Sequence, residues 1–171
     1  MMSSVRFAIP LLVAAALNAQ PTSLVLSQVS APRGGGAVLE LSYASVGDSP
    51  IAALQWTFQY PPEAVSAISL DDGDAASAAH KTVICLGDGS AYKCLAVGAN
   101  AETIGDGVLA RVTVALTPGT TEATILVANT LGVSPDGEPV TVRGENRKIV
   151  FESTAIPRGA PRAAGRVAAN R

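Results

Sequence analysis

Histidine, cysteine and aromatic residues are scarce in this 171-residue chain. It has one histidine, two cysteines and 4% aromatic residues, and only 15% of its residues are charged. A Ser-His-Asp triad needs a histidine held beside the nucleophile, but His80 lies in the small-residue stretch "DAASAAHK" and the sequence contains no G-x-S-x-G motif. Two cysteines and one distant histidine are too few ligands for a zinc site. The sequence therefore predicts neither an enzyme nor a required cofactor.

Long uncharged apolar runs are also missing after the N-terminus, so we expect no membrane span. Residues 1–20, "MMSSVRFAIPLLVAAALNAQ", are typical of a secretory signal peptide, because Arg6 precedes an apolar run and small residues follow it. Cleavage is expected after Ala19, with Ala16 as the alternative. We therefore expect an exported protein, either extracellular or periplasmic.

Basic residues are few outside the C-terminal end. Residues 22–151 carry 13 acidic and 7 basic side chains, a net charge of −6, which argues against nucleic acid as a partner. Residues 152–171 carry one acid and four arginines, a net charge of +3, in an Ala/Pro/Gly/Arg-rich stretch without useful periodicity. We expect this basic tail to be a solvated, disordered extension, with surface anchoring as an alternative role.

Aliphatic residues and turn formers are abundant, since 48% of the chain is hydrophobic and it has 16 glycines and 11 prolines. This composition favours many short strands joined by tight turns. Alternating or apolar segments predict about nine strands and no convincing amphipathic helix, although "PPEAVSAI" (61–68) is compatible with one helical turn. The expected domain, residues 21–151, is an all-β antiparallel sandwich. The expected strands are 22–28, 37–43, 51–60, two around the cysteines, 107–117, 122–129, 138–144 and 147–153.

The stretch "IAALQWTFQY" (51–60) contains the single tryptophan of the chain. If it is a strand, Leu54, Trp56 and Phe58 share one face, and the opposite face is polar. Outward aromatic rings could stack on sugars, but rings that share a face with leucine are more typical of a core. We therefore expect the tryptophan to be buried between two sheets.

Cys85 and Cys94 flank "LGDGSAYK". A type II′ turn at Gly89-Ser90 would place the two cysteines opposite each other in a non-hydrogen-bonded pair, where Cα atoms approach to about 4.5 Å. This spacing is close enough for a cross-strand disulfide, which is expected in an exported chain.

Clustered carboxylates occur in "LDDGDAAS" (70–77). Asp71, Asp72 and Asp74 form a weak calcium candidate because calcium prefers hard oxygen ligands. The stretch lacks the spacing of an EF-hand, so the alternative is a plain acidic loop. We expect no metal in this chain.

Three segments together resemble a cohesin module, the secreted β-sandwich of cellulosome scaffoldins that is related to carbohydrate-binding modules. They are "LQWTFQYPPEAVSAISLDDGD", "ETIGDGVLARVTVAL" and "SPDGEPVTVRGENRKIVF", and the likeness extends from about Thr22 to Phe151. The resemblance implies a nine-stranded jelly roll without a catalytic site, one sheet face of which binds a dockerin on a partner protein. Ala53 and Gln55 stand where dockerin-binding members commonly have Asn and Asp. The resemblance therefore supports the fold of this chain more strongly than it supports a dockerin as its partner.

The leading hypothesis is a secreted recognition module that docks an exported protein, dockerin-like or other, through a polar sheet face. Assuming that positions 57 and 111 share a sheet, this face comprises Gln55, Thr57, Gln59, Arg111 and Thr113. The resemblance also suggests a link to extracellular polysaccharide degradation. The alternatives are carbohydrate binding, for which Tyr43 and Tyr92 would have to point outward, and a structural role as an envelope or extracellular protein.

Overall fold

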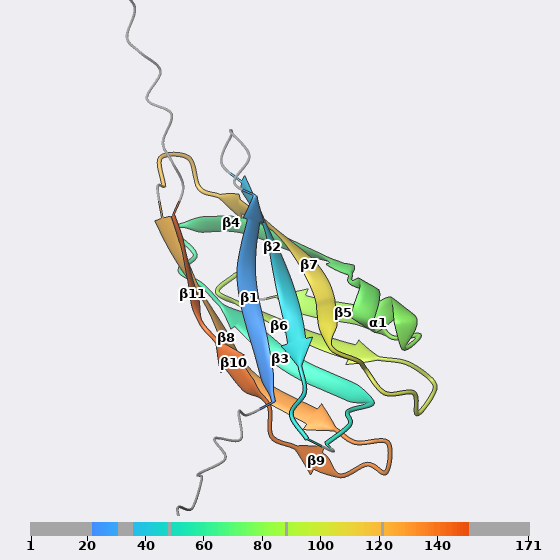
Figure 1. Cartoon of the computed structure of the whole chain (residues 1–171). Coiled ribbons are helices and arrows are strands. Elements are labelled where there is room, and N and C mark those ends of the chain that lie inside the picture. Colours follow the sequence, from blue (N-terminus) through green and yellow to red (C-terminus); the bar gives the residue numbers. More distant parts are fainter. Residues whose placement is uncertain (1–21, 31–35, 48, 88, 121, 151–171) are drawn as a thin grey trace, which may run out of the picture.

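Two β-sheets pack face to face in the computed structural model, which describes residues 22–30, 36–47, 49–87, 89–120 and 122–150. The predicted signal peptide (1–20) and basic tail (152–171) lie outside these residues. Figure 1 shows the sheets as two layers with a short helix at one end. The predicted all-β sandwich is confirmed.

The first sheet has five strands, which are antiparallel neighbours except for one parallel pair, β1 and β10. In spatial order they are β10 (Arg143–Glu145), β1 (Ser23–Ser30), β2 (Gly36–Ala44), β7 (Gly107–Leu116) and β4 (Val65–Asp72).

The second sheet is antiparallel throughout, and its β9 (Pro139–Val140) pairs with the end of β8. The other strands, in spatial order, are β11 (Arg147–Val150), β8 (Glu122–Val133), β3 (Ala53–Gln59), β6 (Ala91–Val97) and β5 (Thr82–Gly87).

Three segments depart from the expected elements. The strand expected at 138–144 is divided into β9, which pairs with β8, and β10, which pairs with β1. Residues 61–68 do make one turn, in which the Pro61 carbonyl accepts the N–H groups of Ala64 and Val65 at 3.0 and 3.1 Å, but β4 then begins at Val65. The helix α1 (Asp74–Ala78) lies where the sequence predicted only an acidic loop. Its buried Ala75 and Ala76 belong to the hydrophobic core. Small alanines let this short helix close one end of the sandwich.

The aromatic residues of β3 lie in the core, as expected. Leu54, Trp56 and Phe58 are fully buried, and the Trp56 and Phe58 rings meet edge to face with centroids 6.2 Å apart. Buried residues from the first sheet, among them Leu39 and Leu41, belong to the same cluster. Alternation along β3 thus turns its apolar residues toward the other sheet.

Cys85 and Cys94 are directly opposite partners in the β5–β6 hairpin and form the predicted disulfide, with Cα atoms 4.1 Å apart. β5 is an edge strand that pairs with β6 alone among the described strands. The disulfide therefore fastens an edge of the second sheet to its interior.

Gly144 lets the chain pass from one sheet to the other without a clash. A Cβ at this position would lie 2.0 Å from the Val127 carbonyl oxygen of β8. Because β10 pairs with β1 and β11 pairs with β8, this contact lies where the two sheets approach each other along one edge.

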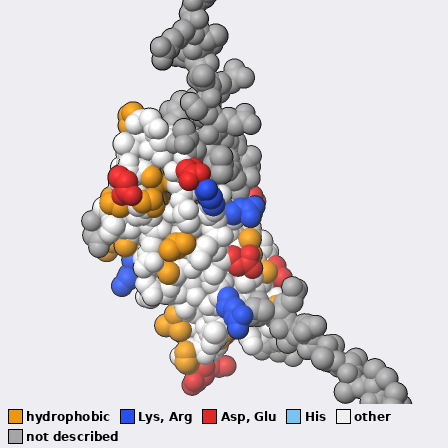
Figure 2. Space-filling view, turned by 90° about the vertical axis from the view of Figure 1, so that its left-hand side faces the viewer, with side chains coloured by type: hydrophobic (Ala, Val, Ile, Leu, Met, Phe, Trp, Pro, Cys, Tyr) orange, Lys and Arg blue, Asp and Glu red, His pale blue; other side chains and the backbone are white. Residues whose placement is uncertain are grey.

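Within the described residues, no helix has the length and hydropathy that a membrane-spanning helix requires. Figure 2 views the molecule from the side of β10 and β11 and shows basic and acidic side chains interspersed there with small apolar patches. One of the mixed pairs is Lys148 with Glu122, whose charged atoms are 2.8 Å apart.

Candidate functional site

The five residues predicted to form one docking surface lie on two different sheets. Gln55, Thr57 and Gln59 are on β3 of the second sheet, whereas Arg111 and Thr113 are on β7 of the first. The assumption that positions 57 and 111 share a sheet is therefore wrong. Alternation shows which residues of a strand face the core, but sheet membership depends on pairing between distant segments.

Arg111 is engaged by neighbouring carboxylates on the outer surface of the first sheet. Its guanidinium lies 3.7 Å from Glu40 of β2 and 3.7 Å from Asp74 of α1. These pairs are exposed and contribute little to stability, but they satisfy the charge of Arg111. The first sheet thus lacks a free cation at this position.

The outer face of the second sheet is built from directly paired residues of four strands. Three rows cross it, and the residues within each row point to the same side. We call these rows together the β5–β8 face. The first row is Ile84, Leu95, Gln55 and Leu131; the second is Leu86, Lys93, Thr57 and Ala128; the third is Ala91, Gln59 and Leu126.

A bulge in β8 keeps this face apolar. Gln55 and Thr57 are two residues apart on β3, yet their β8 partners, Leu131 and Ala128, are three residues apart. The extra β8 residue lies between Ala128 and Leu131, where Asn129 has a positive φ of 51°. Asparagine tolerates this left-handed conformation. Without the bulge, Leu131 would face the core instead of solvent.

The β5–β8 face carries the exposed large hydrophobic residues of the described chain. Ile84 is 55% exposed, Leu86 80%, Leu95 39% and Leu131 44%. Their gathering on one side of one sheet distinguishes this face, because large exposed apolar patches commonly mark interaction sites. The sequence analysis did not predict this patch, because it depends on which strands pair with one another.

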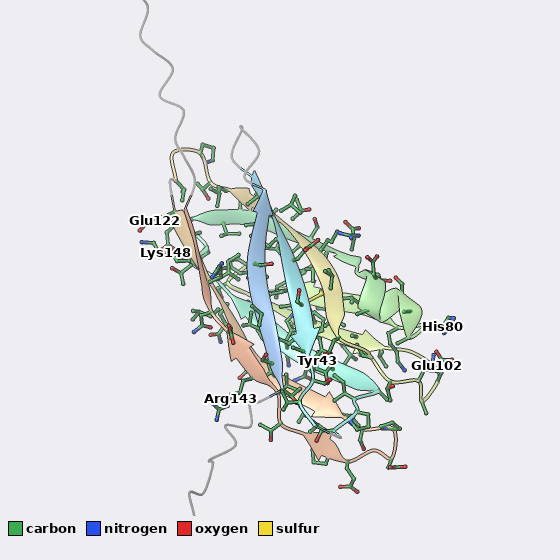
Figure 3. The ribbon with its side chains drawn as sticks, in the orientation of Figure 1. Tyr43, His80, Glu102, Glu122, Arg143 and Lys148 are labelled. Carbon is green, nitrogen blue, oxygen red and sulfur yellow. A yellow bond between two sulfur atoms is a disulfide. The ribbon has the colours of Figure 1, made fainter. Side chains whose placement is uncertain are left out.

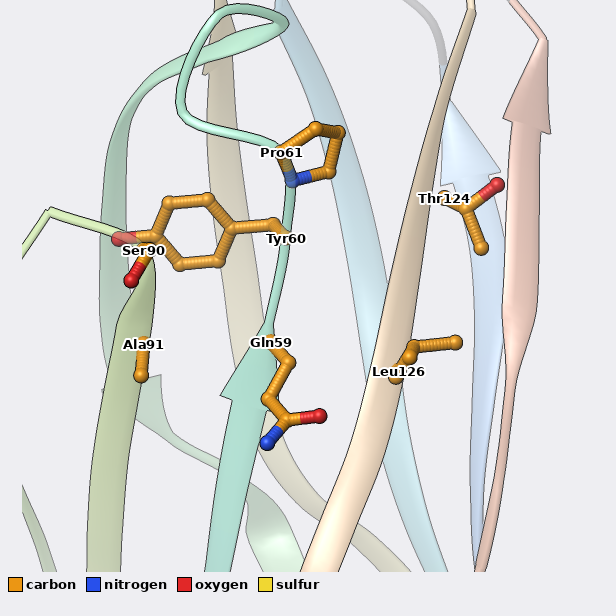
Figure 4. Close-up of a pocket in the computed structure, with 7 residues that line it drawn as sticks. All are labelled: Gln59, Tyr60, Pro61, Ser90, Ala91, Thr124 and Leu126. Atoms are coloured by element: carbon orange, nitrogen blue, oxygen red, sulfur yellow. The ribbon is translucent and has the colours of Figure 1, made fainter.

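A pocket of about 420 Å³ opens at one end of the same face. Figure 4 shows Gln59 and Leu126 on neighbouring strands, with Tyr60 and Pro61 above them and Ser90 and Ala91 on the adjacent hairpin. Gln59, Ala91 and Leu126 are the third row of the β5–β8 face. The pocket therefore extends that face and can accept an apolar side chain.

Thr57 differs from its prediction as an exposed residue, because only 4% of it is accessible. Its Oγ1 is buried and lacks a hydrogen-bond partner among the described residues. Lys93 of β6 and Ala128 of β8 flank it as cross-strand partners. The centre of the β5–β8 face thus contains an unsatisfied hydroxyl, an arrangement that costs free energy.

The two tyrosines that carbohydrate binding would need on the surface do not form an outward platform for sugar rings. Tyr43 is 1% exposed and belongs to the core, so it is not the outward ring that the carbohydrate-binding alternative required. Burial and the nearby Asp106 carboxylate raise the pKa of Tyr43 to about 12. Tyr92 is half-buried and packs against the core. Because both side chains face inward, the carbohydrate-binding alternative loses the rings on which it depended.

Two of the three acidic residues of the calcium candidate, Asp72 and Asp74, have local side-chain partners, and Asp71 lies opposite Arg111 in the β4–β7 register. Asp72 accepts the backbone N–H of Val83 at 2.7 Å, and Asp74 pairs with Arg111. In the part of the chain that the structure describes, no group of three or more His, Cys, Asp or Glu residues is arranged to hold a metal. The observed contacts fit a structural role for these carboxylates, in which Asp72 joins the edges of the two sheets.

His80 belongs to a polar cluster just after the C-terminal end of α1. Its Nδ1 lies 2.7 Å from the Glu102 carboxylate, and both side chains are exposed (Figure 3). The adjacent Lys81 is buried and donates to the backbone carbonyl and side-chain oxygen of Asn100 at 3.0 and 2.5 Å. Asn100 Nδ2 in turn donates to the His80 carbonyl at 3.2 Å. These contacts fix the loop after β6 against the end of α1.

The chain is similar to solved cohesin modules over most of its length. The sixth cohesin of Acetivibrio cellulolyticus scaffoldin B, solved in complex with a Cel5 dockerin mutant, is 16% identical, with a TM-score of 0.66 over 78% of this chain and 100% of that one. The OlpA cohesin of Clostridium thermocellum, also solved with a dockerin, is 16% identical, with a TM-score of 0.65 over 77% of this chain and 99% of that one.

A non-cellulosomal cohesin from the archaeon Archaeoglobus fulgidus is 15% identical, with a TM-score of 0.63 over 80% of this chain and 94% of that one. No protein-family model and no curated protein sequence matches the chain. The fold is that of a cohesin module, as the sequence resemblance predicted.

Proposed function

We propose that this chain is an exported, non-catalytic docking module that binds a protein partner of the dockerin class through its β5–β8 face. The observation that carries this proposal is the placement of Ile84, Leu86, Leu95 and Leu131 on the outer side of one sheet. Burying such a patch against a partner is favourable at roughly 25 cal/mol per Å² of apolar surface.

The similarity to cohesins solved in complex with dockerins supports a protein partner. The signal-like N-terminus and the Cys85–Cys94 disulfide support export, since disulfides persist in oxidising compartments. A dockerin-like partner attached to a hydrolase would link the chain to extracellular polysaccharide degradation. This docking role uses the second sheet, so Arg111 and Thr113 are outside the proposed surface.

The test is a comparison of two arginine substitutions, one on each sheet. The full chain is immobilised, exposed to the exported proteins of the organism that makes it, and the captured proteins are identified by mass spectrometry and then titrated as purified proteins. Leu131→Arg puts a charge in the β5–β8 face and is expected to weaken binding by roughly thirtyfold or more. Thr113→Arg places the same side chain on the first sheet and is expected to leave binding unchanged.

Circular dichroism and thermal unfolding establish that both variants are folded. Capture of the same proteins with equal affinity by the Leu131→Arg variant would rule out the β5–β8 face. Loss of binding in the Thr113→Arg variant alone would assign docking to the first sheet instead.

A further inference from the structure

Lys93 is the only charged residue in the three rows of the β5–β8 face. Its cross-strand partners are Leu86 on one side and Thr57 on the other, and apolar residues occupy most of the remaining positions. No ion pair joins Lys93 to a described acidic residue, whereas Lys148, at the β11 edge of the same sheet, pairs with Glu122 at 2.8 Å. A partner that covers this face must therefore accommodate an ammonium group that has no ion pair with the described part of the chain.

The Thr57 hydroxyl adjoins Lys93 and also lacks a partner. Its side chain is more than nine-tenths buried, and its Oγ1 makes no hydrogen bond within the described structure. A hydroxyl can donate one hydrogen bond, and a lysine ammonium can donate three but accept none. The Lys93 ammonium and the Thr57 hydroxyl can therefore both still donate hydrogen bonds.

These observations decide the chemistry of the partner. An apolar partner would bury the Lys93 ammonium without compensation, and a basic one would repel it. We infer that the partner presents an Asp or Glu carboxylate to the centre of the β5–β8 face, where it accepts a hydrogen bond from the Lys93 ammonium and, once the side chains that cover Thr57 shift on docking, a second one from the buried Thr57 hydroxyl. The inference deepens the proposed function and rests on it.

The net charge of the chain limits how many acidic residues the partner can present around this carboxylate. Residues 22–151 carry a net charge of −6, so a broadly acidic partner surface is repelled at long range. A single carboxylate within an apolar surface meets Lys93 and avoids that repulsion. The described residues of the three rows include no acidic side chain, so a second copy of this chain that docks the same face does not supply the carboxylate from these rows.

The experiment uses a defined probe, a displayed library of two-helix miniproteins randomised on one surface. The library is selected in parallel against the full-length wild-type chain and its Lys93→Glu variant. Binders that lose affinity for Leu131→Arg are those that occupy the β5–β8 face. Arg143→Glu is the matched control, since it reverses an exposed charge on β10 of the other sheet.

Face binders selected on the wild type are expected to share an Asp or Glu, and its replacement by Ala should weaken binding by roughly tenfold to a hundredfold. The same binders should lose affinity for Lys93→Glu but not for Arg143→Glu. Face binders selected on Lys93→Glu should carry Lys or Arg at that place instead. Face binders without a shared acid, or indifferent to Lys93→Glu, would overturn the inference and leave the docking face intact. If no binder depends on Leu131, the proposed function fails and the inference falls with it.

Thr57→Val separates a binding role of the hydroxyl from a structural one. The substitution keeps the shape of the side chain and removes the unsatisfied group, so the thermal unfolding midpoint should rise or stay unchanged. Binding by the acid-bearing face binders should nevertheless fall by roughly tenfold. Unchanged binding by this folded variant would remove Thr57 from the proposed carboxylate site.

Discussion

Reduction of the Cys85–Cys94 disulfide is expected to lower the free energy of unfolding by about 2.7 kcal/mol. The bond has a sequence separation of 9, so it closes a loop of ten residues. In the chain-entropy relation, such a loop removes about 9 cal/mol/K from the unfolded state, which is about 2.7 kcal/mol at 25 °C. For a folded domain of about 130 residues this corresponds to a fall of about 10 °C in the unfolding midpoint.

The assay is chemical denaturation with and without a non-denaturing reductant, followed by hydrogen exchange along β5. Reduction keeps both sulfur atoms, so it tests the cross-link without creating a cavity beside the fully buried Cys94. The Cys85→Ala/Cys94→Ala variant is expected to lose slightly more stability because it also removes core contacts. Exchange should accelerate in β5, which is an edge strand, more than in the central β3.

A change of less than about 0.5 kcal/mol on reduction would refute the entropic reasoning, because it would mean that the unfolded chain is not appreciably constrained by this bond. Equal acceleration of exchange in β3 and β5 would contradict the second part of the prediction. In that case the disulfide would act on the whole sandwich and not mainly on its edge.

Three further predictions concern the fold and its pH dependence. Gly144→Ala should destabilise the protein by about 2 kcal/mol or more, since its Cβ would lie 2.0 Å from the Val127 carbonyl oxygen, and urea denaturation measures the loss. Hydrogen bonds from the Ser45 hydroxyl and N–H to the Asp106 carboxylate lower the pKa of Asp106. The stability that these bonds contribute is therefore present above the unfolded pKa of about 3.9 and is lost as the pH falls through the lower folded pKa. The thermal unfolding midpoint of Asp106→Asn should consequently depend less on pH between about pH 5 and 2 than that of the wild type. Trp56 is fully buried, so its fluorescence should resist iodide quenching in the folded state and become quenchable on unfolding; ready quenching in the folded protein would contradict the described core.

Local sequence patterns determined most of the strands, although not β4, and they determined the buried face of β3 and the disulfide. Leu54, Trp56 and Phe58 alternate with polar residues, and alternation alone fixes which side of a strand faces a core. The spacing of Cys85 and Cys94 about a two-residue turn likewise fixed their register. Both arguments use residues that are close in the sequence, which explains why the structure confirmed them.

The composition of the β5–β8 face was decided only by the tertiary structure. Ile84, Leu95 and Leu131 become neighbours of Gln55 through pairings between distant segments, and the bulge at Asn129 decides which side of β8 they share. Periodicity within one strand carries no information about which strands pair with it, because strand pairing depends on the packing of the whole sandwich. For this reason the sequence predicted a polar surface that combined two sheets, whereas the folded chain presents an apolar one on a single sheet.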